Sequence, residues 1–205
     1  MEGPGVGLDG SDRARLTRAA HFALAWHAGQ YRKGAEVPYV SHLLQVAGLV
    51  LEHGGGADQA VAGFLHDCLE DATSPEQRRA REGILRDEFG EDVLRMVRAC
   101  TDTGEDEVLG NKTPWKERKS RHLEHLLHAD ARCALVMACD KRHNLGALVG
   151  DMRAHGVQYL DRFNAGATDQ VWYFEGIVGA LRDRIPRRLA EELEAMLAEF
   201  RGLVG

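Results

Sequence analysis

The sequence lacks the features that would place the protein in a membrane, in the secretory pathway or on nucleic acid. None of its apolar stretches approaches the roughly 20 residues that a transmembrane helix needs. The first residues contain no basic segment followed by an apolar one, so a secretion signal is not expected. Because 32 acidic residues outnumber 26 basic ones, for a formal net charge of −6, no general positive field favours nucleic acid.

Cysteine is also scarce, and its pattern is not that of a disulfide framework or a zinc ribbon. The chain has 4 cysteines, no two of which form a C-x-x-C pair, and each falls within a helical pattern. This predicts reduced, buried thiols in a cytoplasmic protein that associates with no membrane. The sequence gives no indication of an oligomeric partner.

Alternating strand patterns and internal repeats are absent as well, and nearly every periodic segment predicts a helix. The 205 residues suffice for one all-α domain with a sizeable core. We expect a flexible leader over 1–10, a main domain over 11–185 and a C-terminal helix packed on it over 186–205. Ser11 or Asp12 is expected to cap the first helix. The expected helices cover about 12–28, 39–53, 58–71, 75–89, 91–100, 168–181 and 187–203. Two more are expected to begin at 114, with a charged run through 121, and near 130, with apolar positions through 148.

The helix expected over 58–71 ends in a cluster of metal-ligand types. His66 and Asp67 are adjacent, and Glu70 and Asp71 follow. On a helix, Glu70 lies one turn from His66 and Asp71 one turn from Asp67. An imidazole and three carboxylates on neighbouring faces concentrate negative charge, which a divalent cation would stabilise.

Two other apolar helices contribute the same residue types, His42 at the start of one and Asp140 midway through another. Two imidazoles and two carboxylates suit Mn²⁺, Fe²⁺ or Zn²⁺ with open coordination positions, rather than a closed structural zinc site. Each residue alone has an ordinary alternative, since His42 could cap its helix or lie in the core. Asp140 could pair with Lys141 or Arg142. The ordered conjunction on successive helices favours a metal site.

At this level the sequence resembles the HD-domain metal-dependent phosphohydrolases. It is most similar to their (p)ppGpp hydrolase branch, which includes the SpoT/Rel hydrolase domains and the small metazoan SpoT homologue. The similarity covers roughly residues 14 to 182. It is carried by four ordered strings, HAGQYRKG at 27–34, VPYVSH at 37–42, LHDCLED at 65–71 and CDKRHNL at 139–145.

The resemblance implies an HD-domain helical bundle with one Mn²⁺ ion, or alternatively Fe²⁺ or Zn²⁺, and a small-molecule nucleotide substrate. The implied metal ligands are His42, His66, Asp67 and Asp140. Glu70 and Asp71 are implied to act on the attacking water, because a bound cation acidifies water and a nearby carboxylate can take its proton. The alternative is that both acids cap or solvate a helix end.

The resemblance also implies substrate contacts from Arg32 and Lys33 to the guanosine nucleotide and from Asn144 to the ribose or a nearby phosphate. Lys112 is the further candidate, since it could reach a polyphosphate. The alternative for Arg32 and Lys33 is a solvated charged turn.

The expected function is therefore removal of the 3′-pyrophosphate from (p)ppGpp by attack of a water activated at the metal. Two alternatives remain open. The same centre could act on another nucleotide or phosphomonoester, such as a nucleoside monophosphate, NADPH or a specialised metabolite. The string at 100–106 departs from the long Rel and SpoT enzymes, and together with those at 161–164 and 172–174 it resembles a group of small bacterial HD hydrolases. The second alternative is a non-catalytic nucleotide-binding protein of the same fold. The chain is too short for the synthetase region of the long enzymes, so synthesis is not expected.

Overall fold

The computed structural model describes residues 7–104, 107 and 112–205, and this part of the chain is helical without a β-strand. The expected all-α class is therefore confirmed. Its elements are α1 (Gly10–Trp26), α2 (Val40–Glu52), α3 (Ala57–Leu65), α4 (Pro75–Phe89), α5 (Glu91–Cys100), α6 (Trp115–His128), α7 (Ala131–His155), the 3₁₀ helix η1 (Val157–Arg162), α8 (Ala167–Leu181) and α9 (Arg187–Val204).

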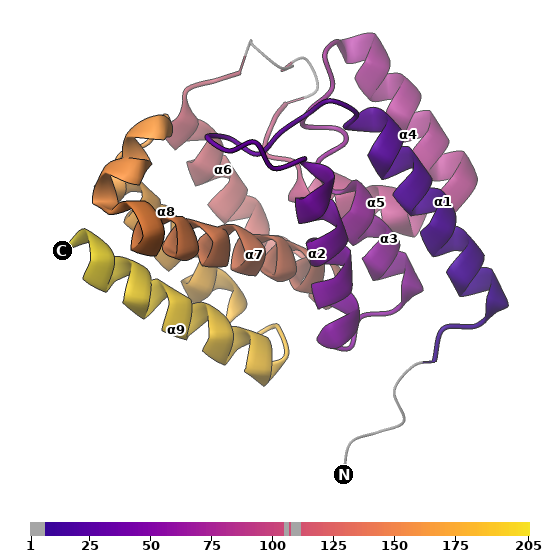
Figure 1. Cartoon of the computed structure of the whole chain (residues 1–205). Coiled ribbons are helices and arrows are strands. Elements are labelled where there is room, and N and C mark those ends of the chain that lie inside the picture. Colours follow the sequence, from indigo (N-terminus) through magenta and orange to yellow (C-terminus); the bar gives the residue numbers. More distant parts are fainter. Residues whose placement is uncertain (1–6, 105–106, 108–111) are drawn as a thin grey trace.

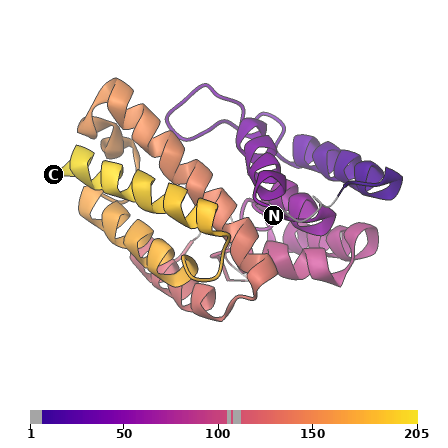
Figure 2. The ribbon, with the colours of Figure 1, turned by 90° about the horizontal axis from the view of Figure 1, so that it is seen from below.

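The longest helix, α7, lies at the centre of the bundle (Figure 1). It packs against α2, α3 and α5 on one flank and against α8 and α9 on the other. Viewed from below, α9 lies alongside α7 and α8 (Figure 2). The expected leader over 1–10 falls largely outside the described residues. Among the described helices, none is long and apolar enough to cross a membrane.

Side-chain caps fix where several helices begin. At α1 the Asp9 carboxylate accepts the backbone N–H of Asp12 at 2.8 Å, and the Asp12 carboxylate accepts that of Asp9 at 3.2 Å. Such a reciprocal capping box satisfies two N–H groups that the helix itself cannot. The prediction that Ser11 or Asp12 caps this helix is wrong, because Asp12 serves as the second member of the box.

The third helix ends at Leu65, so the prediction that it continues to 71 is also wrong. Residues 66–71 form successive turns instead, in which the Cys68 N–H binds the carbonyl of Leu65 at 3.1 Å. The buried Arg81 of α4 donates to the carbonyl of Cys68 at 2.5 Å. A side chain from α4 thus satisfies a carbonyl that a longer helix would have used itself.

The seventh helix runs on past Leu148, the last residue that the apolar pattern assigned to it, and ends at His155. Gly156, with φ of 78°, then reverses the chain into η1. This backbone conformation is in the left-handed region, where glycine has no Cβ penalty. The extension carries Asp151 along the same cavity that the middle of α7 lines.

The segment between α1 and α2 is a short hairpin-like loop. An isolated antiparallel bridge joins Tyr31 to Pro38, and the Arg32 N–H donates to the carbonyl of Val37 at 2.8 Å. The Arg162 guanidinium also donates to the carbonyl of Gly34 at 2.5 Å, which fastens the loop to η1. Arg32 and Lys33 are therefore presented on a loop held at several points.

Candidate metal centre and nucleotide cavity

Four donor side chains from three parts of the chain meet in the interior. His42 comes from the first turn of α2, His66 and Asp67 from the turns after α3, and Asp140 from the middle of α7. His42, His66 and Asp140 are buried, and Asp67 retains a side-chain exposure of 16%. Because α7 packs against both α2 and α3, these donors converge although almost one hundred residues separate the first from the last.

The donor atoms are separated by distances typical of neighbouring metal ligands. His42 Nε2 lies 3.1 Å from His66 Nε2, 3.5 Å from Asp67 Oδ2 and 3.3 Å from Asp140 Oδ1. His66 Nε2 lies 2.9 Å from Asp67 Oδ2 and 3.5 Å from Asp140 Oδ1. Adjacent ligands of a cation held at about 2.0–2.2 Å from each donor have separations in this range.

Hydrogen bonds on the outer nitrogens direct both imidazoles toward the cluster. His66 Nδ1 lies 2.9 Å from the carbonyl oxygen of Gly63, which can only accept, so Nδ1 carries the proton. His42 Nδ1 lies 2.8 Å from His143 Nδ1. If His42 donates this bond, both Nε2 atoms present lone pairs to the same point, which is the tautomer that a metal ligand requires.

The two carboxylates are also held from outside the cluster. The Tyr39 hydroxyl donates to Asp67 Oδ2 at 2.5 Å. The Lys141 ammonium donates to Asp140 Oδ2 at 2.6 Å, and the Asn144 amide donates to Asp140 Oδ1, also at 2.6 Å. Hydrogen bonds of this kind fix a ligand's orientation.

Electrostatics make this cluster suited to a cation. Burial by itself would lower the pKa of His66, but the charges of Asp67 and Asp140 raise it well above its usual value. Burial by itself would raise the pKa of Asp140, yet Lys141 and then His66 hold it well below the usual range. The two carboxylates thus draw positive charge to the point where two imidazole nitrogens converge. The residues present fit a divalent cation.

Glu70 and Asp71, the two acids that follow this cluster, contact different partners. Glu70 Oε1 accepts from the Lys112 ammonium at 3.0 Å and lies 3.9 Å from Nη1 of Arg118. Asp71 Oδ2 accepts from the Gln30 amide at 2.7 Å. Burial, and then the neighbouring charge of Asp67, raise the pKa of Asp71 to about 6. Neither acid is simply solvated at a helix end.

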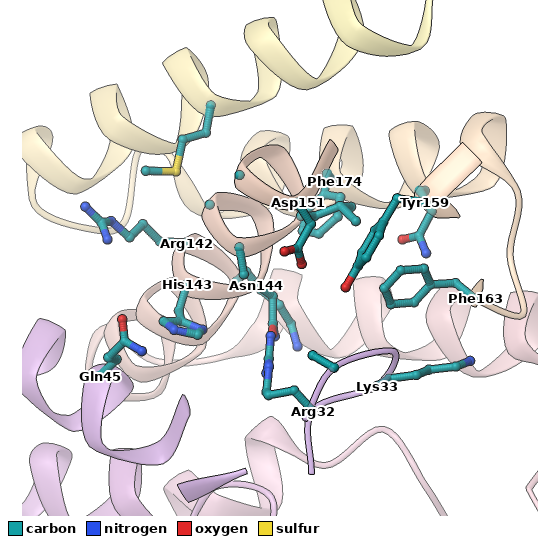
Figure 3. A pocket seen from close by; sticks show the side chains of 18 of the residues that line it. Arg32, Lys33, Gln45, Arg142, His143, Asn144, Asp151, Tyr159, Phe163 and Phe174 are labelled. Carbon is teal, nitrogen blue, oxygen red and sulfur yellow. The ribbon is translucent and has the colours of Figure 1, made fainter. Parts of the chain in front are cut away.

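Beside the metal ligands lies a cavity of about 790 Å³ between the 32–37 loop, α7, η1 and α8. Figure 3 shows Arg32, Lys33 and Asn144 facing this space. Arg32 Nη2 donates to Asn144 Oδ1 at 3.2 Å, so the structure brings two of the expected substrate contacts together. Lys112 does not line the cavity and instead pairs with Glu70.

A family model described as an HD domain matches residues 19–162. The chain belongs to the HD-domain family. This confirms the family expected from the four strings, and membership implies a divalent metal site of the kind that the His and Asp donors form. The helical bundle is the HD-domain fold that the resemblance implied.

Named relatives point to one branch of this family. The guanosine-3′,5′-bis(diphosphate) 3′-pyrophosphohydrolase MESH1 of Xenopus tropicalis is 37% identical over 138 residues, which cover 66% of this chain and 70% of the relative. Human MESH1 is 34% identical over 139 residues, with the same two coverages. A probable guanosine-3′,5′-bis(diphosphate) 3′-pyrophosphohydrolase from Synechocystis is 34% identical over 134 residues, which cover 65% of this chain and 16% of that protein.

Solved structures agree with these relatives. A metazoan orthologue of SpoT that hydrolyses ppGpp superposes with a TM-score of 0.69 at 25% identity, covering 93% of this chain and 97% of the other. The lmo0812 protein of Listeria monocytogenes superposes with a TM-score of 0.63 at 26% identity, covering 83% of this chain and 99% of the other.

Several residues that support the HD-family centre were not assigned a role from sequence. Tyr39 and His143 belong to the strings that carry the resemblance, yet nothing in their spacing shows that they would bind Asp67 and His42. Lys141 was considered as a partner of Asp140 in place of a metal, and it does donate to that carboxylate. His27 was interpreted as a packing residue. It is buried, stacks on Tyr39 with ring centroids 5.3 Å apart and binds Gln30 at 2.7 Å.

A buried charged network lies behind the cavity and links α6 to the loop that follows α5. The Asp102 carboxylate accepts from Arg118 and Lys119. Burial opposes ionisation of Asp102, but Lys119 and Arg118 hold its pKa well below the usual range. Burial lowers the pKa of the neighbouring His122 to about 3, with Lys141 and Lys119 adding to the effect. These interactions fix α6 beside the site.

Proposed function

We propose that this protein is a metal-dependent phosphohydrolase that removes the 3′-pyrophosphate from ppGpp or pppGpp. The observation that carries the proposal is the convergence of His42, His66, Asp67 and Asp140 beside a nucleotide-sized cavity. The named MESH1 relatives, whose printed activity is this reaction, support the choice of substrate.

We assign the four converging residues as ligands of one Mn²⁺ ion, with Fe²⁺ or Zn²⁺ as alternatives. Two imidazole nitrogens, two carboxylates and no thiolate suit such borderline-to-hard ions. The four cysteines are free and buried, and burial raises the pKa of Cys139, next to Asp140, to about 12. When bound, the cation supplies Lewis-acid chemistry, since it acidifies water and polarises a phosphoryl oxygen.

We assign Glu70 as the residue that takes a proton from the attacking water. Lys112 and Arg118 both approach Oε1, and no described residue hydrogen-bonds to Oε2. Oε2 can therefore face a water molecule while Oε1 stays anchored. Asp71, held by Gln30, is assigned to position that water or a second one.

The substrate contacts follow from the lining of the cavity. We assign Arg32 and Lys33 to the nucleotide, because a guanidinium can both stack on a planar base and bind phosphate. Asn144, which bridges Asp140 and Arg32, is assigned to the ribose or its 3′-phosphate. Lys112 would contact a phosphate from the Glu70 side. The free thiols and the nucleotide substrate are consistent with the cytoplasm as the site of action.

The test is product analysis with the purified protein, stripped of metal and reloaded with Mn²⁺. We expect pyrophosphate and GDP from ppGpp, and no turnover in the metal-free sample. A panel of nucleoside monophosphates, NADPH and other phosphomonoesters is assayed in parallel for orthophosphate. Robust orthophosphate release from one of these, with no pyrophosphate from ppGpp or pppGpp, would overturn the proposed substrate. Absence of turnover of any compound would leave a binding protein instead.

A further inference from the structure

Four side chains form a stripe along α7 that leads away from the metal ligands. Asp140, Asn144, Ala147 and Asp151 are separated by four, three and four residues, which places them on one face of the helix. The stripe begins at a proposed metal ligand and ends at Asp151. Its last three members line the cavity.

The charges that line this cavity are distributed unevenly. Five cationic side chains face it, and Asp151 is the one carboxylate among the described lining residues. The cationic residues are Arg32, Lys33, Lys119, Lys141 and Arg142. No described Lys or Arg forms a salt bridge with Asp151, whose carboxylate lies within hydrogen-bonding reach of the Tyr159 phenol. Asp151 is therefore available to a ligand that brings its own hydrogen-bond donors.

The walls next to Asp151 suit a flat ligand. The rings of Tyr159 and Phe163, with centroids 5.9 Å apart, line the cavity near Asp151 (Figure 3). On α7 the lining residues between Asn144 and Asp151 are Gly146, Ala147, Leu148 and Gly150, so leucine is the one large side chain among them. Aromatic walls of this kind are typical of a site for a heterocyclic base.

The orientation of a nucleotide follows from these charges. A carboxylate without a bound cation repels phosphate, so the base belongs near Asp151. The phosphates belong at the other end of the stripe, near the proposed metal ion and the cationic residues. The rise of α7 between Asn144 and Asp151 is about 10 Å. This span can hold a ribose at Asn144 with the far edge of a purine at Asp151.

Resting on the proposed function, we propose that Asp151 determines base specificity by accepting hydrogen bonds from the N1–H and 2-amino groups of guanine. Guanine presents these two donors side by side, which a carboxylate can accept in a bidentate manner. Adenine presents an unprotonated N1 at the same edge, so it would leave the carboxylate unpaired. Inosine retains the N1–H and lacks the 2-amino group, and it is therefore the intermediate case.

The test measures equilibrium binding of GDP, IDP and ADP to the Mn²⁺-loaded protein by calorimetry. We expect the wild type to bind GDP most tightly and ADP least tightly. Asp151→Asn should weaken GDP binding about tenfold to 100-fold, the range expected for loss of a bidentate base contact, and reduce the preference for GDP over IDP and ADP. Asp161→Asn is the matched control, because Asp161 is exposed on η1, does not line the cavity and gives the same change in charge.

Equal affinity of the wild type for the three nucleotides, or no binding of any, would overturn this proposal. So would an unchanged preference in Asp151→Asn, or an equal loss in Asp161→Asn. Thermal unfolding of both variants verifies that they fold. A guanine preference that depends on Asp151, found without hydrolysis of ppGpp, would remove the proposed function alone. Hydrolysis of ppGpp with an unchanged preference in the variant would remove the role of Asp151 alone.

Discussion

Replacing His143 with leucine should weaken metal binding although His143 is not one of the proposed ligands. His143 Nδ1 lies 2.8 Å from His42 Nδ1. Burial, and then the nearby His42 and Arg32, lower the pKa of His143 to about 3, so its ring is neutral near pH 7 and Nδ1 can accept a hydrogen bond from His42. A leucine at this position would leave the Nδ1–H of the buried His42 without a partner and would favour the tautomer that blocks Nε2.

The size of the effect follows from the hydrogen bond that is lost. Leaving a buried N–H unpaired costs about 1–3 kcal/mol, and disruption of a hydrogen bond behind a metal-bound histidine weakens metal affinity about tenfold to 100-fold. The two ranges agree, because a tenfold change in affinity corresponds to about 1.4 kcal/mol. We therefore expect the Mn²⁺ dissociation constant of His143→Leu to rise by one to two powers of ten.

Calorimetric titration of the metal-free protein with Mn²⁺ measures this directly. His143→Asn, which keeps a hydrogen-bond acceptor, should recover part of the affinity. His125→Leu is the matched control, since His125 is exposed on α6. The reasoning is refuted if His143→Leu binds Mn²⁺ as tightly as the wild type, or if the control loses as much affinity.

Three further outcomes are expected. Asp67→Ala should abolish Mn²⁺ retention and turnover while preserving helix content, as measured by metal analysis and circular dichroism; normal turnover would mean that the ligands are wrongly assigned. Glu70→Gln should lower kcat by about 10² to 10⁴ with Mn²⁺ content unchanged, and a wild-type kcat would exclude Glu70 as the proton acceptor. Because burial lowers the pKa of His122 to about 3, its ring stays neutral when folded and the stability it contributes is lost as pH falls below 6.5. Urea unfolding should therefore show the stability difference between wild type and His122→Asn shrinking by about 2 kcal/mol from pH 7.5 to 5, and a constant difference would contradict this.

The sequence predicted most of the helices and the four metal-ligand candidates, because both leave local signals. Apolar periodicity marks a helix whatever it packs against, and the four strings are specific in their order. Convergence of His42 with Asp140 needed the resemblance, since no local pattern shows that α2 and α7 pack together. In the structure, His42 Nε2 and Asp140 Oδ1 are nonetheless 3.3 Å apart.

The predicted end of the third helix was wrong because a side chain distant in sequence replaced a backbone hydrogen bond within the helix. Apolar periodicity continues through Leu69, which favoured a helix to 71, but Arg81 from α4 takes the carbonyl of Cys68 and the chain turns instead. The contact between His42 and His143 could not be predicted from local sequence either, since 101 residues separate the two histidines.

The restraint of the loop that carries Arg32 and Lys33 affects how tightly a ligand binds. Its Tyr31–Pro38 bridge, the bond from Arg162 to Gly34 and the 3.1 Å bond from Lys33 to Asn164 already restrain it. Ordering a free backbone costs about 1–2 kcal/mol per residue, and here that entropy is given up during folding rather than on association. More of the contact energy of Arg32 and Lys33 then becomes net affinity, because this entrance is preorganised.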